Sequence, residues 1–419
     1  MVKIAHLADT HLGFRLRYGL INKWKEKNKI TWYENNIYQA WNIIIEAILD
    51  QKDKLDCVIH AGDIYHTPFR GYPYPPLENA RTLLMKSLKH FFTLTNEKIP
   101  FILIDGNHGI YPEYQYSPID PAKEIFPNLH YFSKDDLRAA IRENHRLSFK
   151  LEEKRINFNL FPYFDYTFLP EYAKLYDNWV NTVQTPIKGY INIAVVHGMR
   201  ADKTLHPKIL EQNYDYIALG HLHNQNQINE KTYNPGSIYP LYFGEKGPNW
   251  GMCFVDIKSG ANPIITPYNV QMRNQLKEIQ IDISPKLTTS DIISRIEHEL
   301  DQFRGEWNND NASRVKIKFS GGIKLENYWQ TRDELEILKR KMDNTMSHNI
   351  LQLVWTWEET KTELGEEIKP GTIIEYILED PKQEFKEFIQ EKVDSKKVDL
   401  DLLSELAVDS IENALKELE

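Results

Sequence analysis

Five short apolar segments in the first 220 residues each end in, or run directly into, side chains that can bind a metal ion. The segments are VKIAHLA (2–8), LDCVIHA (55–61), PFILIDG (100–106), INIAVVHG (191–198) and YDYIALG (214–220). Apolar runs this short, bounded by turn residues, are typical of buried strands. The side chains at their ends are Asp9, His11, Asp63, Asn107, His197, His221 and His223. Because open α/β folds place their sites at the carboxyl edge of a sheet, we expect these side chains to converge.

The segments between these runs predict an α/β domain at residues 1–270. Residues 37–49 and Glu78–Phe92 have the apolar spacing of helices that pack on a sheet. Residues 146–164 alternate on both sides of a charged turn and predict a hairpin. Antiparallel strands with Gly and Pro turns are predicted within 232–244 and 250–270, so the sheets should be mixed.

A second, smaller unit is predicted at residues 275–359. Its pattern is strand, helix, strand, helix, strand, at residues 276–283, 291–303, 314–320, 326–342 and 350–357. A polar linker follows at 360–371. The last segment, 372–419, contains two amphipathic stretches, 372–393 and 399–418. These helices either fold back on the body of the protein or dock to a partner helix or coiled coil.

The charge is unevenly distributed along the chain. The formal net charge is −9, but residues 358–419 hold 19 acidic and 8 basic residues, which leaves 41 acidic and 43 basic in the rest. The overall acidity therefore does not exclude a nucleic-acid partner. A basic run interleaved with aromatic residues can contact phosphates, or can be a solvated loop. Its candidate DNA-binding residues are Arg15, Arg17, Lys23 and Lys25.

The composition favours a protein of a reducing compartment. Cys57 and Cys253 lie in apolar contexts without the spacing of a metal or redox pair, so we expect buried structural thiols. No run approaches the ~20 apolar residues of a membrane helix, and the N-terminus lacks a signal-peptide pattern. We expect a cytoplasmic location, associated with the nucleoid if the protein is prokaryotic.

The mixture of predicted ligands indicates the chemistry. Imidazole nitrogen combined with carboxylate and amide oxygen suits manganese, iron or zinc better than calcium. Two such ions need a bridging anion, and a carboxylate is the natural one; the pair can then activate water and bind a phosphate. We therefore expect hydrolysis of a phosphoester. The chain has no phosphate-binding loop of the Gly-x-x-x-x-Gly-Lys-Ser/Thr type, so ATP hydrolysis would require a partner.

The order D-x-H, G-D, G-N-H, H, G-H-x-H resembles that of the calcineurin-like metallophosphoesterases. The stretches ADTHLG, HAGDIYH, DYIALGHLH and YNPGS further resemble the nuclease subunit of SbcCD-type DNA double-strand-break repair complexes. This resemblance implies a metallophosphoesterase β-sandwich flanked by helices, a small α+β capping domain that binds DNA, and a C-terminal helical segment. It also implies a homodimer that binds a coiled-coil ABC-type ATPase (SbcC-like) through that segment.

The resemblance also implies a role for each predicted site residue. One ion, most simply Mn²⁺, would be held by Asp9, His11, Asp63 and His223, and a second by Asp63, Asn107, His197 and His221, with Asp63 as the bridge. His108 would assist the leaving oxygen or stabilise charge in the transition state, and His66 would position the scissile phosphate unless it is only a turn residue. Gly109 departs from the pattern, because the resembling family commonly has an acid there.

Three functions remain open at this stage. The resemblance implies a manganese-dependent nuclease, acting as an exonuclease on duplex ends and as an endonuclease on single strands or hairpins, in repair or in defence against phage. The same ions would also serve a phosphatase or cyclic-nucleotide phosphodiesterase. A scaffold without activity is disfavoured, since the complete ligand set is present.

Overall fold

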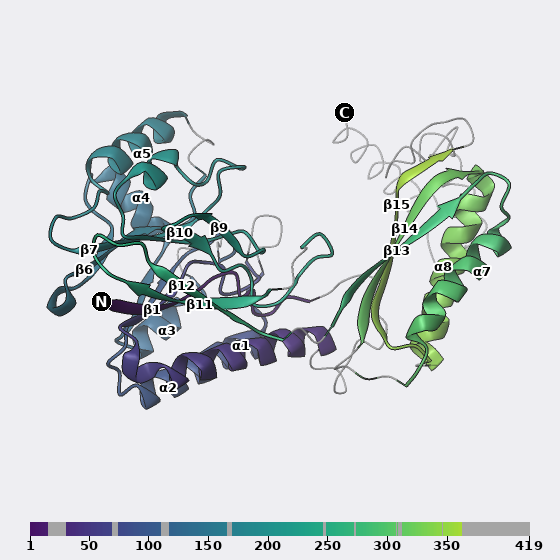
Figure 1. Ribbon diagram of the computed structural model, residues 1–419, viewed down its shortest axis with the longest axis horizontal. Coiled ribbons are helices and arrows are strands. Elements are labelled where there is room, and N and C mark those ends of the chain that lie inside the picture. The colour runs from purple at the N-terminus through teal and green to yellow at the C-terminus, as the bar shows by residue number, and fades with distance from the viewer. Residues whose placement is uncertain are drawn as a thin grey trace, which may run out of the picture. The chain divides into compact units, whose positions relative to one another are not determined.

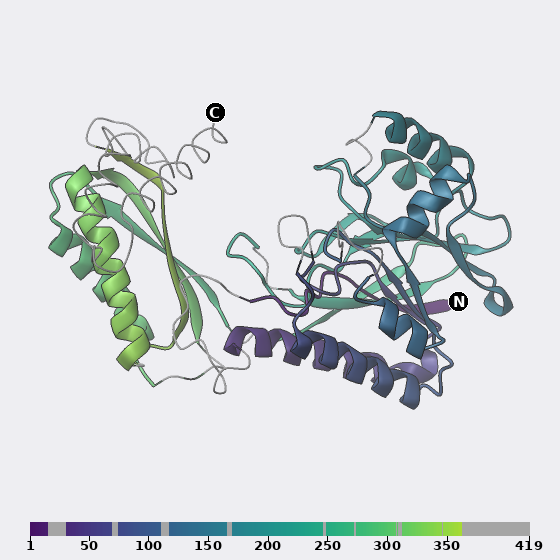
Figure 2. The ribbon, with the colours of Figure 1, turned by 180° about the vertical axis from the view of Figure 1, so that it is seen from behind.

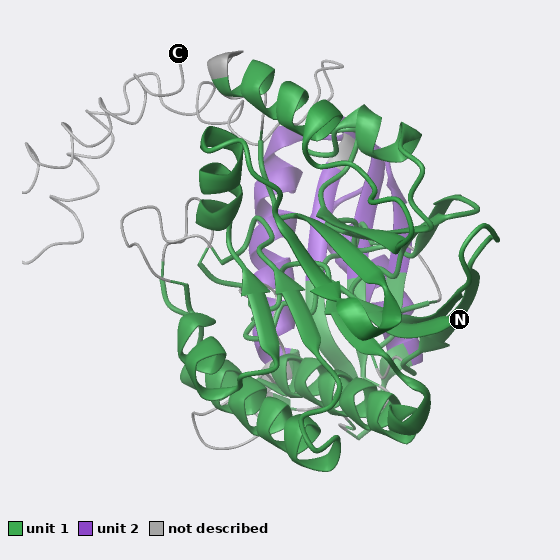
Figure 3. Ribbon diagram, turned by 90° about the vertical axis from the view of Figure 1, so that its left-hand side faces the viewer, with its two compact units in different colours: residues 1–277, 303–315, 342–353 green, residues 278–302, 316–341, 354–419 purple. Residues whose placement is uncertain are grey.

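The computed structural model describes residues 1–15, 31–68, 74–109, 117–165, 170–245, 249–271, 274–306, 308, 312–345 and 347–362. The chain divides into two compact units (Figure 3). Unit 1 comprises residues 1–277, 303–315 and 342–353. Unit 2 comprises residues 278–302, 316–341 and 354–419, of which the last described residue is Thr362.

Unit 1 contains two mixed sheets of six strands each. The first has the order β12-β11-β1-β2-β3-β4, with β12 (Ile264–Asn269), β11 (Gly251–Ile257), β1 (Val2–Leu7), β2 (Cys57–His60), β3 (Phe101–Ile104) and β4 (Leu129–Phe132). The second has the order β5-β6-β7-β8-β10-β9, with β5 (Ser148–Leu151), β6 (Ile156–Phe161), β7 (Ile191–His197), β8 (Tyr216–Gly220), β10 (Thr232–Asn234) and β9 (Asn226–Asn229). Strands β1 to β4 are parallel, as are β6, β7, β8 and β10. The mixed α/β fold is as predicted, including the β5–β6 hairpin.

Helices cover the outer sides of the two sheets (Figure 1). They are α1 (Trp32–Asp50), α2 (Glu78–Leu94), α3 (Asp120–Ile125), α4 (Lys134–Arg142), α5 (Pro170–Thr182) and α6 (Pro207–Glu211), with short 3-10 turns at η1 (Lys52–Lys54) and η2 (Glu152–Lys154). From behind, α1 and α2 lie side by side (Figure 2), and the Trp41 indole donates to Ser87 Oγ between them at 2.9 Å. No described helix is both long and apolar enough to span a bilayer.

Helix α1 begins five residues before the predicted start because Thr31 caps it. The Thr31 hydroxyl accepts the backbone N–H of Glu34 at 3.1 Å and so satisfies one of the free donors at the helix start. The sequence prediction used only the apolar spacing, which begins at Ile37, and therefore missed this first turn.

The core of unit 1 has two layers because β1, β2 and β3 are buried on both faces. In β3, Phe101 and Leu103 pack in the cluster that includes α1 and α2, whereas Ile102 and Ile104 pack in the cluster between the two sheets. Burial on both faces explains why these strands read as continuous apolar runs. It also fixes where each strand ends, and thus where the polar residues begin.

Residues from late in the chain complete unit 1. Arg314 is almost fully buried, and its guanidinium donates to Tyr33 Oη at 2.7 Å, to the Leu241 carbonyl at 3.0 Å and to Gln352 Oε1 at 2.8 Å. The Pro240 carbonyl accepts a further bond at 3.3 Å. A buried cation is tolerable only when its donors are satisfied in this way. Arg314 therefore fixes the loop that contains Pro240 and Leu241.

Most of the third sheet and of two helices belongs to unit 2. The sheet has the order β13-β14-β15, with β13 (Leu276–Ile283), β14 (Ser313–Ile323) and β15 (Ile350–Thr362), and the helices are α7 (Thr289–Leu300), followed by η3 (Asp301–Phe303), and α8 (Leu325–Thr345). Strands β13, β14 and β15 begin, and α8 ends, in residues of unit 1. The predicted succession of strands and helices is confirmed. Thr288 starts α7 two residues early through a capping box with Asp291. The predicted helices at 372–393 and 399–418, and most of the 360–371 linker, lie outside the described residues.

Candidate metal centre

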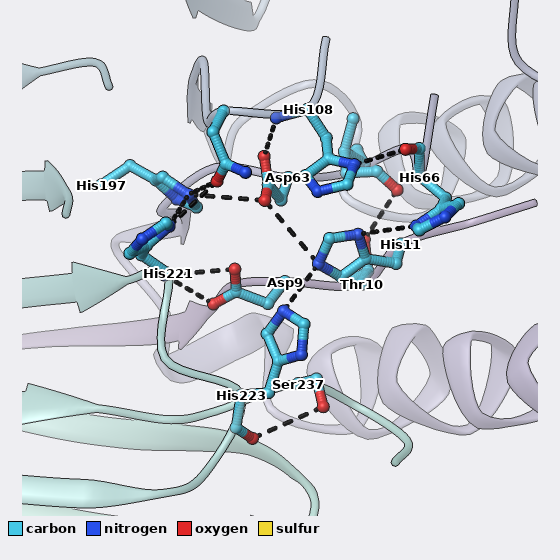
Figure 4. A network of polar contacts seen from close by, with 12 residues as sticks. Asp9, Thr10, His11, Asp63, His66, His108, His197, His221, His223 and Ser237 are labelled. Carbon is cyan, nitrogen blue, oxygen red and sulfur yellow. Dashed lines mark hydrogen bonds and ion pairs between the residues drawn. The ribbon is translucent and has the colours of Figure 1, made fainter. Parts of the chain in front are cut away.

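The seven predicted ligands converge where five strands of unit 1 end (Figure 4). Strands β1, β2 and β3 of the first sheet run directly into the turns that hold four of them. Strands β7 and β8 of the second sheet supply the other three. In order along the chain, the residues are Asp9, His11, Asp63, Asn107, His197, His221 and His223. The expectation of convergence at a sheet edge is therefore correct in geometry.

Four of these residues adopt a left-handed backbone conformation. The φ angles are +50° at Asp9, +43° at His11, +57° at Asp63 and +93° at His221. Such angles cost on the order of 1–3 kcal/mol each for a residue with a side chain, and they persist only where the surroundings enforce them. In each turn this left-handed conformation directs the side chain of the ligand residue toward the other predicted ligands.

Asp9, His11 and His223 form one group. One ligand atom of each lies within 4.8 Å of the others, and His11 Nε2 is 3.0 Å from His223 Nε2. The Asp9 carboxylate is oriented by the backbone N–H of His221, which donates at 2.8 Å to Oδ2. Burial raises the pKa of Asp9 to about 7, and it lowers the pKa of His11 well below the usual range.

Asp63 lies at the centre of the cluster. Its Oδ1 accepts the His108 backbone N–H at 2.7 Å. Its Oδ2 lies 3.4 Å from His197 Nε2 and 3.7 Å from His11 Nε2, so one oxygen faces both halves of the site. Burial acts to raise the pKa of Asp63, but the imidazoles of His197, His108 and His11 outweigh it and hold the pKa well below its usual range. Asp63 is therefore a carboxylate throughout the neutral range.

Asn107, His197 and His221 form the other half. Asn107 Oδ1 is 3.1 Å from His197 Nε2 and 2.9 Å from His221 Nδ1, and the two imidazole nitrogens are 3.2 Å apart. The opposite nitrogen of His197 is bonded to the Ala61 carbonyl at 2.7 Å. Burial acts to lower the pKa of His197, but the Asp63 carboxylate outweighs it and raises the pKa to about 9.

His108 and His66 lie beside the cluster rather than within it. His108 Nδ1 is hydrogen-bonded to the backbone carbonyl of His66, and His66 Nδ1 is 3.4 Å from His11 Nδ1. The His66 ring also packs edge-on against Phe14, with centroids 4.8 Å apart. Both histidines therefore lie next to the predicted ligands, as expected for groups that would contact a substrate held there.

Of the predicted DNA-binding residues, only Arg15 lies in the described part of the chain. Its Nε donates at 2.6 Å to the buried carboxylate of Glu34, which also accepts the Tyr38 hydroxyl at 2.6 Å. This contact gives Arg15 a structural role at the start of α1. The others, Arg17, Lys23 and Lys25, lie outside the described residues.

The sequence analysis missed two carboxylates that contact predicted ligands from behind. Asp202 Oδ2 is 2.8 Å from His221 Nε2, and Glu245 Oε1 is 2.5 Å from His223 Nδ1. Neither lies at the end of an apolar run, so the pattern that identified the ligands could not find them. The YNPGS stretch supports His223 differently, because the Ser237 N–H donates to the His223 carbonyl at 2.9 Å.

Two histidines inside the apolar runs, and both cysteines, are buried. His6 is hydrogen-bonded to the Tyr216 hydroxyl at 2.8 Å and the Leu219 carbonyl at 3.1 Å, and His60 to Thr10 Oγ1 at 3.1 Å. Burial lowers the pKa of each imidazole to about 3. Cys57 and Cys253 are buried free thiols, as expected.

The donor set fits two divalent ions. The facing atoms are imidazole nitrogens, carboxylate oxygens and one amide oxygen, at separations of 2.9 to 3.7 Å among the pairs given above. This mixture suits borderline divalent metals. Where the strand ends of the two sheets meet, the chain therefore has the kinds of donor that a two-ion phosphoesterase site uses.

Comparison with known proteins agrees with this site. The family model for calcineurin-like phosphoesterases matches residues 2–225, which include all seven predicted ligands. A DNA double-strand break repair protein Mre11 of Aeropyrum pernix is 26% identical over 293 residues, 68% of this chain and 64% of that protein. A protein of the same name from Saccharolobus solfataricus is 32% identical over 108 residues, 26% of this chain and 23% of that protein. The chain thus matches less than two thirds of the length of these relatives. It belongs to the calcineurin-like phosphoesterase family.

Proposed function

We propose that this chain is a manganese-dependent DNA nuclease that hydrolyses phosphodiester bonds with two metal ions. The observation that carries the proposal is the position of Asp63 Oδ2, which faces a ligand nitrogen from each half of the cluster, as a bridging carboxylate would. The family uses divalent metals, and both relatives are DNA double-strand break repair proteins by name.

In this proposal the ligands divide into two sets that share Asp63. One set is Asp9, His11, Asp63 and His223, and the other is Asp63, Asn107, His197 and His221. Bound ions would activate a water molecule and neutralise charge that builds on the phosphate oxygens. The protein contributes fixed donors, so little reorganisation is needed when the substrate binds.

His108 is proposed to protonate the leaving oxygen. Its Nδ1 donates a hydrogen bond to the His66 carbonyl, so the proton proposed to pass to the leaving oxygen is a second one, held on Nε2 of the imidazolium form, which leaves the ring neutral after the transfer. The Nδ1 atoms of His66 and His11 are 3.4 Å apart, and His66 is proposed to position the scissile phosphate. A polymer substrate uses such a contact, whereas a small phosphomonoester does not require it.

The substrate class is tested with two substrates and one matched pair of variants. Purified protein with Mn²⁺ is incubated with linear duplex DNA and, separately, with a small aryl phosphate. We expect cleavage of DNA by the wild type and by Asp177→Asn, and none by Asp63→Asn. Asp177 is a matched control because it also pairs with a histidine, His206, at 3.1 Å, outside the cluster. Activity on the aryl phosphate alone would overturn the nuclease proposal in favour of a small-ester phosphatase or phosphodiesterase.

The mode of cleavage is proposed to be exonucleolytic on duplex ends and endonucleolytic on single strands and hairpins, by a homodimer. End-labelled duplexes, circular single strands and hairpins separate these activities on one gel. Light scattering gives the mass of the particle, for which a monomer is 49.4 kDa. A monomer at assay concentration, or cleavage of duplex ends without cleavage of circles, would remove the corresponding part of the proposal.

The partner is proposed to be a coiled-coil ABC-type ATPase that binds the acidic segment from Thr372 onward. Deletion of this segment should abolish binding of the ATPase and leave Mn²⁺-dependent cleavage intact. Loss of both would show instead that the segment is needed for the fold of the nuclease. A repair role predicts that cells lacking the protein are sensitive to double-strand breaks; sensitivity only to phage would favour defence.

A further inference from the structure

We propose that Asp202 and Glu245 are positioning residues that fix the protons of His221 and His223, so that each histidine presents its unprotonated nitrogen to a metal ion. This inference rests on the proposed two-metal site and extends it to residues that are not ligands. It follows from which nitrogen of each imidazole faces the cluster and what the other nitrogen contacts.

His221 faces the cluster with Nδ1. That nitrogen lies 2.9 Å from Asn107 Oδ1 and 3.2 Å from His197 Nε2, whereas Nε2 lies 2.8 Å from Asp202 Oδ2 on the far side of the ring. A carboxylate only accepts hydrogen bonds, so Nε2 must carry the proton. Nδ1 is then left with its lone pair directed at the place of an ion.

His223 has the opposite arrangement. Its Nε2 faces the cluster, 3.0 Å from His11 Nε2, and its Nδ1 lies 2.5 Å from Glu245 Oε1. Here the carboxylate requires a proton on Nδ1, so Nε2 is the nitrogen that can offer a lone pair to an ion. Two histidines that are only two residues apart thus use different nitrogens, and each has its own carboxylate on the nitrogen that must keep the proton.

Both carboxylates are themselves held in place. Asp202 Oδ1 accepts the Thr204 N–H at 3.0 Å and the Thr204 hydroxyl at 2.6 Å. Glu245 is mostly buried, and its Oε2 accepts the Leu241 N–H at 2.6 Å. Each carboxylate therefore accepts hydrogen bonds on both of its oxygens, an arrangement that an amide cannot reproduce because it has one acceptor oxygen.

The effect expected of such residues is on the metal rather than on the fold. A carboxylate behind a ligating imidazole orients the ring, selects its tautomer and raises the basicity of the ligating nitrogen. Loss of one typically weakens metal binding 10- to 100-fold. Because each carboxylate supports a different proposed ion, we expect each substitution to weaken the binding of one ion and spare the other.

The test uses Asp202→Asn, Glu245→Gln and the control Asp177→Asn, in the full chain. In Asp202→Asn the oxygen that remains is required by the Thr204 donors, so the amide NH₂ faces His221 Nε2 and drives the proton to Nδ1. In Glu245→Gln one oxygen must serve both His223 and the Leu241 N–H. Calorimetric titration with Mn²⁺ should show two sites in the wild type and in Asp177→Asn, and one site weakened 10- to 100-fold in each of the other two variants.

A second measurement does not depend on metal. Two-bond ¹H–¹⁵N spectra of the metal-free, ¹⁵N-histidine-labelled protein show which ring nitrogen bears the proton. The proton of His221 should lie on Nε2 in the wild type and in Asp177→Asn, and on Nδ1 in Asp202→Asn. Unchanged Mn²⁺ binding in both site variants, or an unchanged His221 tautomer in Asp202→Asn, would overturn the inference. Failure of the wild type to bind Mn²⁺ or to cleave DNA would instead overturn the proposed function, and the spectra would still decide the role of Asp202.

Discussion

A single added methyl group should disable the site without removing any ligand. Gly106 precedes Asn107 and lies directly against Asp63. A Cβ at position 106 would lie 2.6 Å from the backbone N and the Cγ of Asp63, and closer still to Oδ1. Ordinary contact of a Cβ begins at 3.4 Å. The Gly106→Ala substitution therefore requires Asp63, Asn107 or both to move by about 0.8 Å or more.

This displacement is large for a metal centre. Ligand distances are tolerated within about ±0.2 Å, and a misplacement of about 1 Å in a catalytic constellation can cost on the order of 10²-fold in rate. A 100-fold loss corresponds to about 2.7 kcal/mol of transition-state stabilisation. Overpacking should also lower the free energy of unfolding by about 1–3 kcal/mol. We expect at least a 100-fold lower kcat/KM on DNA and weaker binding of both ions, since Asp63 is the proposed bridge.

The assay compares Gly106→Ala with Gly244→Ala. A Cβ at Gly244 has no atom within 4 Å and the backbone there is not left-handed, so this control adds the same methyl group without a collision. Mn²⁺ titration, DNA cleavage and urea unfolding are measured on both variants and the wild type. If Gly106→Ala binds two ions with wild-type affinity and cleaves DNA within twofold of the wild-type rate, the close contact between Gly106 and Asp63 is not what holds the bridge.

Three further predictions concern other residues of unit 1. His108→Ala should bind both ions but cleave DNA about 10²- to 10⁴-fold more slowly, as measured by single-turnover kinetics; an unchanged rate would refute its proposed role. Burial lowers the pKa values of His6 and His60 to about 3, so both imidazoles are neutral in the folded protein and gain protons on unfolding below about pH 6.5. Each should therefore lower the free energy of unfolding by about 2 kcal/mol between pH 7 and pH 5. In urea unfolding, His6→Gln should lose half of the pH dependence that the two histidines together contribute. Gly109→Asp would add the acid that is common in the resembling family. It should lower the melting temperature and not raise activity, because φ at residue 109 is +116° and the new Cβ would lie 3.4 Å from the Asp105 carboxylate. A tenfold gain in the rate of DNA cleavage would show that the missing acid matters.

Within each sheet, the positions of the predicted ligands could be predicted because they depend on chain direction. Each predicted ligand lies at or just after the carboxyl end of a buried parallel strand, and neighbouring parallel strands bring such ends to the same edge. That the edges of the two sheets meet depends on how the sheets pack against each other, which the strand pattern does not report. The same reasoning correctly placed the β5–β6 hairpin and the succession of elements from β13 to β15. These features follow from local periodicity, which the sequence displays directly.

Other features depend on contacts between distant segments and left no local trace. Asp202 and Glu245 were missed because nothing near them in sequence marks a carboxylate that will meet an imidazole from behind. The first turn of α1 was missed for a different, local reason: its cap, Thr31, contacts Glu34 only three residues away but precedes the apolar pattern. Which ring nitrogen of His221 and of His223 faces the cluster depends on the left-handed turn after β8 and on the contacts with Asp202 and Glu245. The spacing of residues in the sequence does not predict it.

The burial of Arg314 links the metal centre to the order in which the chain is made. The loop that presents Glu245 has its carbonyl groups bonded to a guanidinium that appears much later in the sequence, and that guanidinium is in turn held by Gln352. Roughly 100 residues separate Glu245 from Gln352, which takes about 5 to 20 s at ~5–20 residues per second. During that interval the nascent protein already carries every proposed ligand, but the loop behind His223 lacks the hydrogen bonds of Arg314 and keeps only earlier contacts, such as that of the Tyr33 hydroxyl with the Pro240 carbonyl. A chain cut short after β12 would remain in that state permanently.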